Sequence, residues 1–259
     1  MPGTVDLHCH LLPGLDDGAR DVDDAVAMVR QAQADGVCAI CATPHIRADH
    51  GVVIDELPAR REQLSASLRA AGCGVRVLAG GEVAATMVDA LEDSELAAVA
   101  LGGSDRWILL EPAPGPLDSR FQDVVESLHA RGFRALIAHP ERHAGPDLIK
   151  HLSQLIGRGA LVQATAAYFS EQHTRPAMLE LAQAGVIHVL GSDSHSSRVG
   201  RPVALSPALE ALRAVDAIRG HLAWVARTAP HAIVRGEDPI CPFTPRDTGS
   251  ASTYGRVST

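Results

Sequence analysis

Two histidines one residue apart are the first residues in the sequence that could do chemistry together. His8 and His10 lie in the stretch VDLHCHLLPGLDDGA (5–19), where two aspartates follow them closely. Successive side chains of a β-strand point to opposite faces, so the two imidazoles point the same way and Cys9 points the other way. Two converging imidazoles can bind one metal ion. An HxH pair alone is more often a pair of ordinary surface or core histidines than a pair of ligands, so the rest of the chain must decide.

The same kinds of side chain recur where other short apolar runs end. Imidazole and carboxylate groups are the ligands that divalent metals of borderline and hard character prefer. Each residue alone has a simpler interpretation, as a turn residue, a helix cap or a buried histidine. Together they follow six apolar runs, whereas random placement would scatter them over helices and loops. The candidate metal ligands are His8, His10, Asp17, His45, Glu82, Glu111, His139, Asp193 and His195.

The elements that must position these ligands alternate along the chain. Apolar runs predict strands at 5–8, 37–42, 75–80, 106–111, 134–139, 160–164 and 188–193. Amphipathic stretches predict helices near 21–34, 57–71, 121–131, 147–157 and 175–184. This repetition predicts an α/β protein with a parallel sheet, either doubly wound or closed into a barrel. Because the carboxyl ends of parallel strands open onto one face, the ligands should meet there, in numbers sufficient for two or three ions.

Composition indicates a globular protein with a full-sized core. Apolar residues make up 46% of the 259 residues and charged residues 21%, and α/β barrels reach this length as single domains. No composition break occurs before residue 240, and the small, polar residues after it are typical of disorder. We therefore predict one domain over residues 1–239 and a disordered tail over 240–259.

Charge and cysteine usage narrow the function classes. The formal charge is −8, with no basic stripe, which argues against a nucleic-acid partner. No apolar segment is long enough to span a membrane, and the amino terminus lacks the pattern of a signal peptide. The five cysteines are odd in number, and Cys38 and Cys41 lie in an apolar run where core packing is the simpler interpretation. These features predict a reduced, cytoplasmic protein.

The other histidines provide a comparison. His188 lies at the amino end of its predicted strand, away from the expected site, whereas His50 and His143 follow site motifs closely enough to line a cleft. The histidines without a partner motif are His129, His151, His173, His221 and His231.

The ordered motifs HxH, DDG, TPH, GxE, AHPER and SDxH resemble the polymerase-and-histidinol-phosphatase (PHP) superfamily. HCHLLPGLDDGA, ATPH and IAHPERH are similar to its bacterial metal-dependent protein-tyrosine phosphatases of the CpsB/CapC type. The resemblance runs from about residue 4 to about residue 238. It implies a distorted, TIM-like (β/α)7 barrel that holds two to three divalent ions, Mn²⁺ first, with Fe, Zn or Mg as alternatives.

The resemblance also implies how the ligands are shared. One ion would lie among His8, His10, Glu82 and Asp193. Glu82 would bridge to a second ion, held also by Glu111 and His139. A third would lie among Asp17, His45 and His195. Asp16 is expected to support the turn or the ligands from outside.

Arginines supply the expected phosphate contacts. Arg142 of HPER and Arg201 of RVGRP match phosphate-binding positions of the family. Because the spacing from His195 to Arg201 is one residue longer than expected, Arg198 is a rival. Arg47 lies where related chains are basic.

The expected reaction is hydrolysis of a phosphate monoester by attack of a metal-activated hydroxide on phosphorus. Asp193, His195 or a metal-bound water would assist the leaving group. No Cys-x5-Arg loop surrounds any cysteine, which excludes the cysteine-phosphatase mechanism. The resemblance implies a phosphotyrosine protein substrate, namely a cognate bacterial tyrosine kinase of capsule or exopolysaccharide synthesis. A small-molecule phosphatase such as histidinol-phosphate phosphatase and a non-catalytic metal-binding regulator are the alternatives, and the sequence leaves the oligomeric state open.

Overall fold

Parallel strands surrounded by helices make up the computed structural model, which describes residues 3–143, 145 and 147–245. One sheet has three strands in the order β1-β2-β4, namely Thr4–Cys9, Val37–Ala42 and Arg76–Leu78. The other has six strands in the order β3-β5-β6-β7-β8-β9, namely His45–Ile46, Glu82–Ala84, Trp107–Glu111, Arg134–Ile137, Leu161–Thr165 and Val189–Gly191. Every strand pair is parallel.

The two sheets meet between β1 and β9. There the His10 N–H donates to the Ser194 carbonyl at 3.0 Å, and the Asp193 N–H donates to the His8 carbonyl at 2.8 Å. Backbone hydrogen bonds therefore hold four polar residues beside one another at the carboxyl ends of β1 and β9, namely His8, His10, Asp193 and Ser194.

The α/β class and the parallel arrangement are confirmed, and every predicted strand is found. The described residues nevertheless form nine strands rather than seven, because two short strands that were not predicted, β3 and β5, follow β2 and β4. After β2, Pro44 lacks the N–H needed to continue a ladder, and β3 begins at His45 in the other sheet. After β4, a Cβ on Gly80 would lie 2.9 Å from Thr43 Cγ2, and a Cβ on Gly81 would lie 2.9 Å from Ile46 Cγ1. This close approach of backbones needs glycine, and β5 begins directly afterwards.

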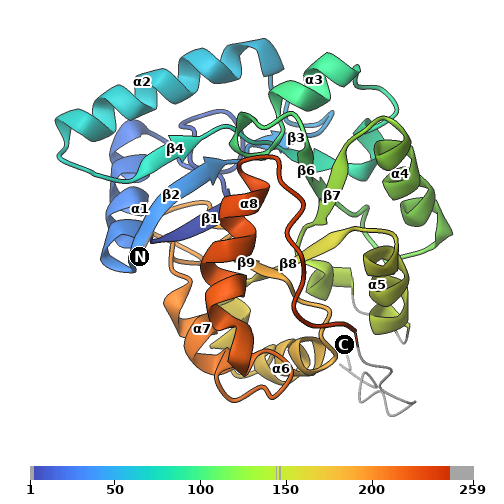
Figure 1. Cartoon of the computed structure of the whole chain (residues 1–259). Coiled ribbons are helices and arrows are strands. Elements are labelled where there is room, and N and C mark those ends of the chain that lie inside the picture. Colours follow the sequence, from blue (N-terminus) through green and yellow to red (C-terminus); the bar gives the residue numbers. More distant parts are fainter. Residues whose placement is uncertain (1–2, 144, 146, 246–259) are drawn as a thin grey trace.

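Seven helices of the described chain cover the outside of the strands (Figure 1). They are α1 (Val22–Ala34), α2 (Leu57–Ala70), α3 (Asp93–Ala98), α4 (Ser119–Ala130), α5 (Leu148–Gly157), α6 (Arg175–Gln183) and α7 (Ser206–Leu212). An eighth helix, α8 (Ala229–Ile233), packs on β1. The five predicted helices are confirmed as α1, α2, α4, α5 and α6. In α1, the Asp21 side chain caps the amino end by accepting from the Asp24 N–H, as acidic residues before an apolar stripe predict.

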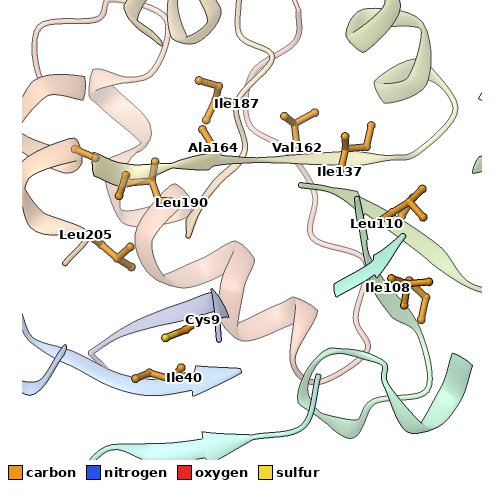
Figure 2. Packing of buried hydrophobic residues seen from close by; sticks show 14 of the residues in the cluster. Cys9, Ile40, Ile108, Leu110, Ile137, Val162, Ala164, Ile187, Leu190 and Leu205 are labelled. Carbon is orange, nitrogen blue, oxygen red and sulfur yellow. The ribbon is translucent and has the colours of Figure 1, made fainter. Parts of the chain in front are cut away.

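Two apolar clusters hold the strands in place. Alternate residues of the central strands belong to different clusters, as expected for parallel strands that are buried on both faces. The first cluster includes Cys41, Leu109, Leu136 and Val189, together with Ala229 and Ile233 of α8. The second includes Ile40, Leu110, Ile137 and Val162 of the strands (Figure 2). Side chains of the surrounding helices belong to the same cluster. The polar side chains described below lie where these strands end.

Part of the predicted tail is packed rather than disordered. The Phe243 ring stacks on His188 with centroids 5.8 Å apart, and lies edge-on to Trp224 at 5.5 Å. The Thr244 carbonyl approaches Gly185 so closely that a Cβ there would lie 2.9 Å from it. The boundary predicted at residue 239 thus precedes residues that pack on the domain, because one aromatic side chain outweighs a polar composition. Residues 246–259 lie outside the described residues.

Two further sequence predictions concern membranes and thiols. Within the described part of the chain, no helix is both long and apolar enough to cross a membrane. All five cysteines are free, and both Cys9 and Cys41 are fully buried. Burial raises the pKa of the Cys41 thiol to about 12, so it is inert at neutral pH. The prediction that the Cys38–Cys41 pair serves packing is confirmed for Cys41.

Candidate metal centre

The carboxyl ends of the strands bring all nine predicted ligands to one place. The most buried are His8, His10 and Glu82 at 0% exposure, with His139 and Asp193 at 1%. The Nε2 atoms of His8 and His10 are 3.2 Å apart, so the two imidazoles converge as predicted. Cys9 packs in the apolar cluster on the helix side and takes no part. Burying this many ionisable groups is unfavourable unless they are paired or bind a cation.

Glu82 is the centre of the cluster. Its Oε2 lies 3.3 Å from Nε2 of His8, 3.3 Å from Nε2 of His10 and 2.9 Å from Nδ1 of His45. Its Oε1 lies 2.7 Å from Nε2 of His139. Burial alone would raise the pKa of this carboxyl, but the surrounding imidazoles outweigh it and hold the pKa well below its usual range. One buried carboxylate therefore faces four imidazoles, as a bridging ligand would.

Three overlapping groups of ligand atoms lie close enough to share an ion each. In each group the atoms all lie within 4.8 Å of one another. The groups are His10, Asp17, His45 and His195; His8, His10 and Glu82; and His45, Glu82 and Glu111.

The overlap with the sets implied by the family resemblance is close. Asp17, His45 and His195 come together as expected, joined by His10. Asp193 Oδ1 lies 3.4 Å from Nε2 of His8, beside the second group. His139 was expected to share an ion with Glu82 and Glu111. Its Nε2 contacts Glu82, but His139 is in none of the three groups found among the described residues.

Unpaired polar atoms show that these residues fit a cation. Glu82 Oε2, His45 Nδ1 and Asp193 Oδ1 are buried and have no hydrogen-bond partner among the described residues. Glu82 Oε2 and His45 Nδ1 approach to 2.9 Å without the alignment of a donor and an acceptor. Leaving such atoms unpaired costs about 1–3 kcal/mol each, whereas two ligands directed at one cation take up this arrangement naturally. The mixture of imidazole nitrogen and carboxylate oxygen suits divalent transition metals.

Asp16 supports the ligands from outside, as predicted. Its carboxylate accepts from Nδ1 of His10 at 2.8 Å, and from the backbone N–H groups of His45 and Gly18 at 2.9 Å each. Burial disfavours a charged imidazole, yet Asp16 and Glu82 raise the pKa of His10 to about 9. In the neutral imidazole, donation from Nδ1 to Asp16 leaves the lone pair of His10 on Nε2, which faces the cluster.

Two ligands have an unusual backbone conformation. His139 has φ +28° and Asp193 has φ +50°, in the left-handed region that residues with a Cβ seldom adopt. Such a conformation costs on the order of 1–3 kcal/mol and concentrates at functional sites. Each residue lies two positions after the end of a strand, and its side chain contacts Glu82 (His139) or His8 (Asp193).

The arginines lie at the open side of the cluster. Arg142 forms an ion pair with Asp193 Oδ2. Arg201 donates from Nε and Nη2 to the Asp193 carbonyl at 2.8 and 2.6 Å. Arg198 is exposed and has no side-chain contact with the ligands in the described structure, so the geometry favours Arg201. Arg47 Nη1 lies 3.4 Å from Glu111 Oε2.

The remaining histidines divide, as predicted, into those that border the cluster and those that do not. His50 stacks on His45 at 4.8 Å, and His143 stacks on His139 at 6.4 Å, so both border the cluster. His188 lies at the opposite end of β9. The histidines predicted to be ordinary belong to none of the candidate metal groups among the described residues.

Two supporting residues were missed by sequence reasoning. Gln163 lies in β8 and its Oε1 is 2.9 Å from Nδ1 of His8. Asp24 of α1 accepts from the N–H of Ser197 at 2.9 Å and from the Ser196 hydroxyl, which fixes the loop after Asp193. A polar residue at an inward position of an apolar strand was the available signal for Gln163. Asp24 resembled an ordinary first-turn acid.

A family model described as "Capsular polysaccharide synthesis, CpsB/CapC" matches residues 4–216. The chain belongs to the CpsB/CapC family. Tyrosine-protein phosphatase YwqE of Bacillus subtilis is 33% identical over 204 residues, which cover 74% of this chain and 77% of YwqE. The putative tyrosine-protein phosphatase CapC of Staphylococcus aureus is 27% identical over 199 residues, with the same coverage of both chains. The resemblance found in the motifs is confirmed.

Solved structures agree with this membership of the CpsB/CapC family. A crystal structure described with YwqE from Bacillus subtilis and CpsB from Streptococcus pneumoniae, "unique metal-dependent tyrosine phosphatases", superposes with a TM-score of 0.77 at 26% identity. It covers 94% of this chain and 99% of the other. A β-aspartyl dipeptidase from Fervidobacterium islandicum, with TM-score 0.56 and 14% identity, shares the fold alone.

Proposed function

We propose that this protein is a metal-dependent tyrosine-protein phosphatase that acts in capsule or exopolysaccharide synthesis. The observation that carries the proposal is the buried Glu82 carboxylate facing four imidazoles. Arg142 and Arg201 pair with Asp193, whose other carboxylate oxygen lies 3.4 Å from Nε2 of His8 in the same cluster. Membership of the CpsB/CapC family supports the reaction and its setting, since YwqE is named a tyrosine-protein phosphatase and CapC a putative one.

The nine ligands would hold two to three divalent ions, with Mn²⁺ proposed first and Fe, Zn or Mg as alternatives. Three ligand groups that share His10, His45 and Glu82 support more than one ion. When bound, the ions would supply positive charge to a phosphate dianion and lower the pKa of a bound water.

Arg142 and Arg201 would bind the non-bridging phosphate oxygens. Both guanidinium groups already contact Asp193, so this carboxylate joins the metal-binding and phosphate-binding parts of the site. A guanidinium can present two parallel N–H donors to a phosphate group. Substrate would therefore be oriented by hydrogen bonds from side chains that the protein has already positioned.

His195 acts as a ligand in this proposal. Burial and the neighbouring His10 lower its pKa to about 3, so the imidazole is neutral at pH 7. A neutral imidazole suits metal binding better than proton donation. A tyrosine leaving group, whose phenol has a pKa of about 10, needs less protonation than an alkoxide.

The proposed substrate is the phosphotyrosine segment of a cognate bacterial tyrosine kinase, and the proposed location is the cytoplasm, where buried thiols such as Cys9 persist reduced. We also propose that the two sheets form one distorted (β/α)7 barrel. In that description, β2 with β3 and β4 with β5 each count as one bent strand.

A substrate panel tests the proposed function. Purified protein with its measured metal content is assayed on a phosphotyrosine peptide, a phosphoserine peptide and histidinol phosphate. We expect hydrolysis of the phosphotyrosine peptide at a kcat/KM at least about tenfold above the others. Preference for histidinol phosphate would replace the proposal with a small-molecule phosphatase. Full metal occupancy without turnover of any substrate would indicate a metal-binding regulator.

A further inference from the structure

Gln163 is an amide buried among apolar residues. It lies in the middle of β8, flanked by Val162 and Ala164, and is 0% exposed. Burying an amide costs free energy unless its polar atoms find partners. Its Oε1 has one partner, Nδ1 of His8 at 2.9 Å, whereas its Nε2 has none among the described residues. Among the described residues, the hydrogen bond with His8, a candidate ligand, is therefore the one polar contact of this buried amide.

The contact determines which His8 nitrogen can bind a cation. A neutral imidazole has one N–H donor and one acceptor nitrogen. When Nδ1 donates to Gln163 Oε1, the lone pair remains on Nε2. That nitrogen faces Glu82 Oε2 at 3.3 Å and Asp193 Oδ1 at 3.4 Å. Nε2 of His8 is thus available on the side where the other ligand atoms converge.

The same arrangement recurs on His10, where Asp16 accepts from Nδ1 at 2.8 Å and Nε2 faces Glu82. The two histidines of the HxH motif are therefore oriented by different groups, a carboxylate on His10 and a neutral amide on His8.

The neighbouring strand makes room for the amide. Gly191 of the neighbouring strand β9 lies against both residues. A Cβ at this position would be 2.8 Å from His8 Cβ and 2.9 Å from Gln163 Cδ and Nε2. Glycine at position 191 therefore leaves room for the amide and the imidazole side by side.

We propose that Gln163 is a positioning residue for the metal centre, which keeps His8 protonated on Nδ1 and so leaves Nε2 to bind a divalent cation. The inference rests on the proposed function, because it assumes that the cluster binds metal. Groups that orient metal-binding histidines typically change metal affinity by about 10- to 100-fold when removed.

Two substitutions separate hydrogen bonding from packing. Gln163→Leu removes the acceptor at similar volume, and Gln163→Glu restores an acceptor. We expect Gln163→Leu to weaken Mn²⁺ affinity by about 10- to 100-fold, measured by competition with a chelating indicator, and Gln163→Glu to stay within about threefold of wild type. Thr165→Val is the matched control, because Thr165 is an inward residue of the same strand whose hydroxyl has no partner among the described residues. It should leave Mn²⁺ affinity unchanged.

A Gln163→Leu protein with wild-type affinity would overturn the proposal, and so would a Gln163→Glu protein as impaired as Gln163→Leu, since both results point to packing alone. A wild-type measurement covers the case in which Gln163→Leu fails to fold. Imidazole ¹⁵N shifts of the Zn²⁺-loaded protein should show His8 protonated on Nδ1, and protonation on Nε2 would contradict the inference. Failure of the wild-type protein to bind metal at all would instead refute the proposed function.

Discussion

Acidification should destabilise the protein through His188, which lies far from the metal ligands. The imidazole is 1% exposed, and its Nδ1 accepts a hydrogen bond from the Val162 N–H at 3.2 Å. Burial lowers the pKa of His188 to about 3. Protonation would place a charge in an apolar, aromatic environment and turn the accepting nitrogen into a second donor facing the Val162 N–H.

The sign and size follow from proton linkage. An unfolded histidine titrates near 6.5, so between pH 6.5 and pH 3 the unfolded chain binds more protons at this residue than the folded chain does. The stability that the neutral form provides is present above pH 6.5 and is lost as the pH falls towards 3. At about 1.36 kcal/mol for each pKa unit, lowering the pH from 7 to 5 should cost about 2 kcal/mol of unfolding free energy.

A His188→Asn variant isolates this effect, because the asparagine Oδ1 can still accept from the Val162 N–H. At pH 7 we expect the variant to be less stable by about 0.5–1.5 kcal/mol, through loss of ring contacts with Phe243 and Trp224. At pH 5 the two proteins should be equally stable, or the variant more so. Urea unfolding of both proteins without metal, at pH 7, 6 and 5 and constant ionic strength, measures the difference. A difference that stays constant within about 0.5 kcal/mol over this range would refute the reasoning.

Three further predictions concern the metal centre. Glu82→Gln should lower Mn²⁺ affinity by at least about 100-fold, measured by metal content after dialysis, and full occupancy would contradict the bridging role. Arg201→Lys should lower kcat/KM on a phosphotyrosine peptide by about 10- to 100-fold, because lysine cannot present two parallel N–H donors to the phosphate. Arg198→Lys should change kcat/KM less than about twofold. Equal effects of the two substitutions would count against the choice of Arg201. Gly191→Ala should destabilise the fold by about 1–3 kcal/mol through overpacking and lower Tm by about 2–4 °C for each kcal/mol, and an unchanged Tm would mean that His8 and Gln163 yield easily.

The positions of the candidate ligands along the sequence were sufficient to predict that these side chains gather at one face. His139, Glu111 and Asp193 all come at or just after apolar runs, and parallel strands bring such ends to one face. The prediction depended on residue type and place in the strand, both of which the sequence contains. It did not require knowledge of how many strands the sheet has.

The division into two sheets depends on long-range contacts. Gly80 and Gly81 are needed because their backbones pass close to Thr43 and Ile46, which are more than thirty residues away in sequence. No local pattern reveals such an approach, and strands as short as His45–Ile46 carry too few residues for a period of two to be read.

Supporting groups were also hidden, for a related reason. Gln163 looks like a single polar residue in an apolar strand until His8 is placed 2.9 Å away. The left-handed backbone of Asp193 is likewise hidden, since no glycine at that position marks it in the sequence. Phe243 packs because His188 and Trp224 offer it a surface. Each of these features is fixed by tertiary structure rather than by local propensity.

The most direct test of the central claim is phosphotyrosine hydrolysis by one protein sample with and without its metal. The sample is stripped with a chelator, its metal content is measured, and the rate on a phosphotyrosine peptide is recorded before and after addition of Mn²⁺. We predict that the rate of hydrolysis falls with metal content and returns on reloading. The Glu82→Gln variant should hydrolyse the peptide neither before stripping nor after addition of Mn²⁺. A stripped wild-type protein that keeps its full rate, or a fully loaded one that hydrolyses no phosphotyrosine, would contradict the account.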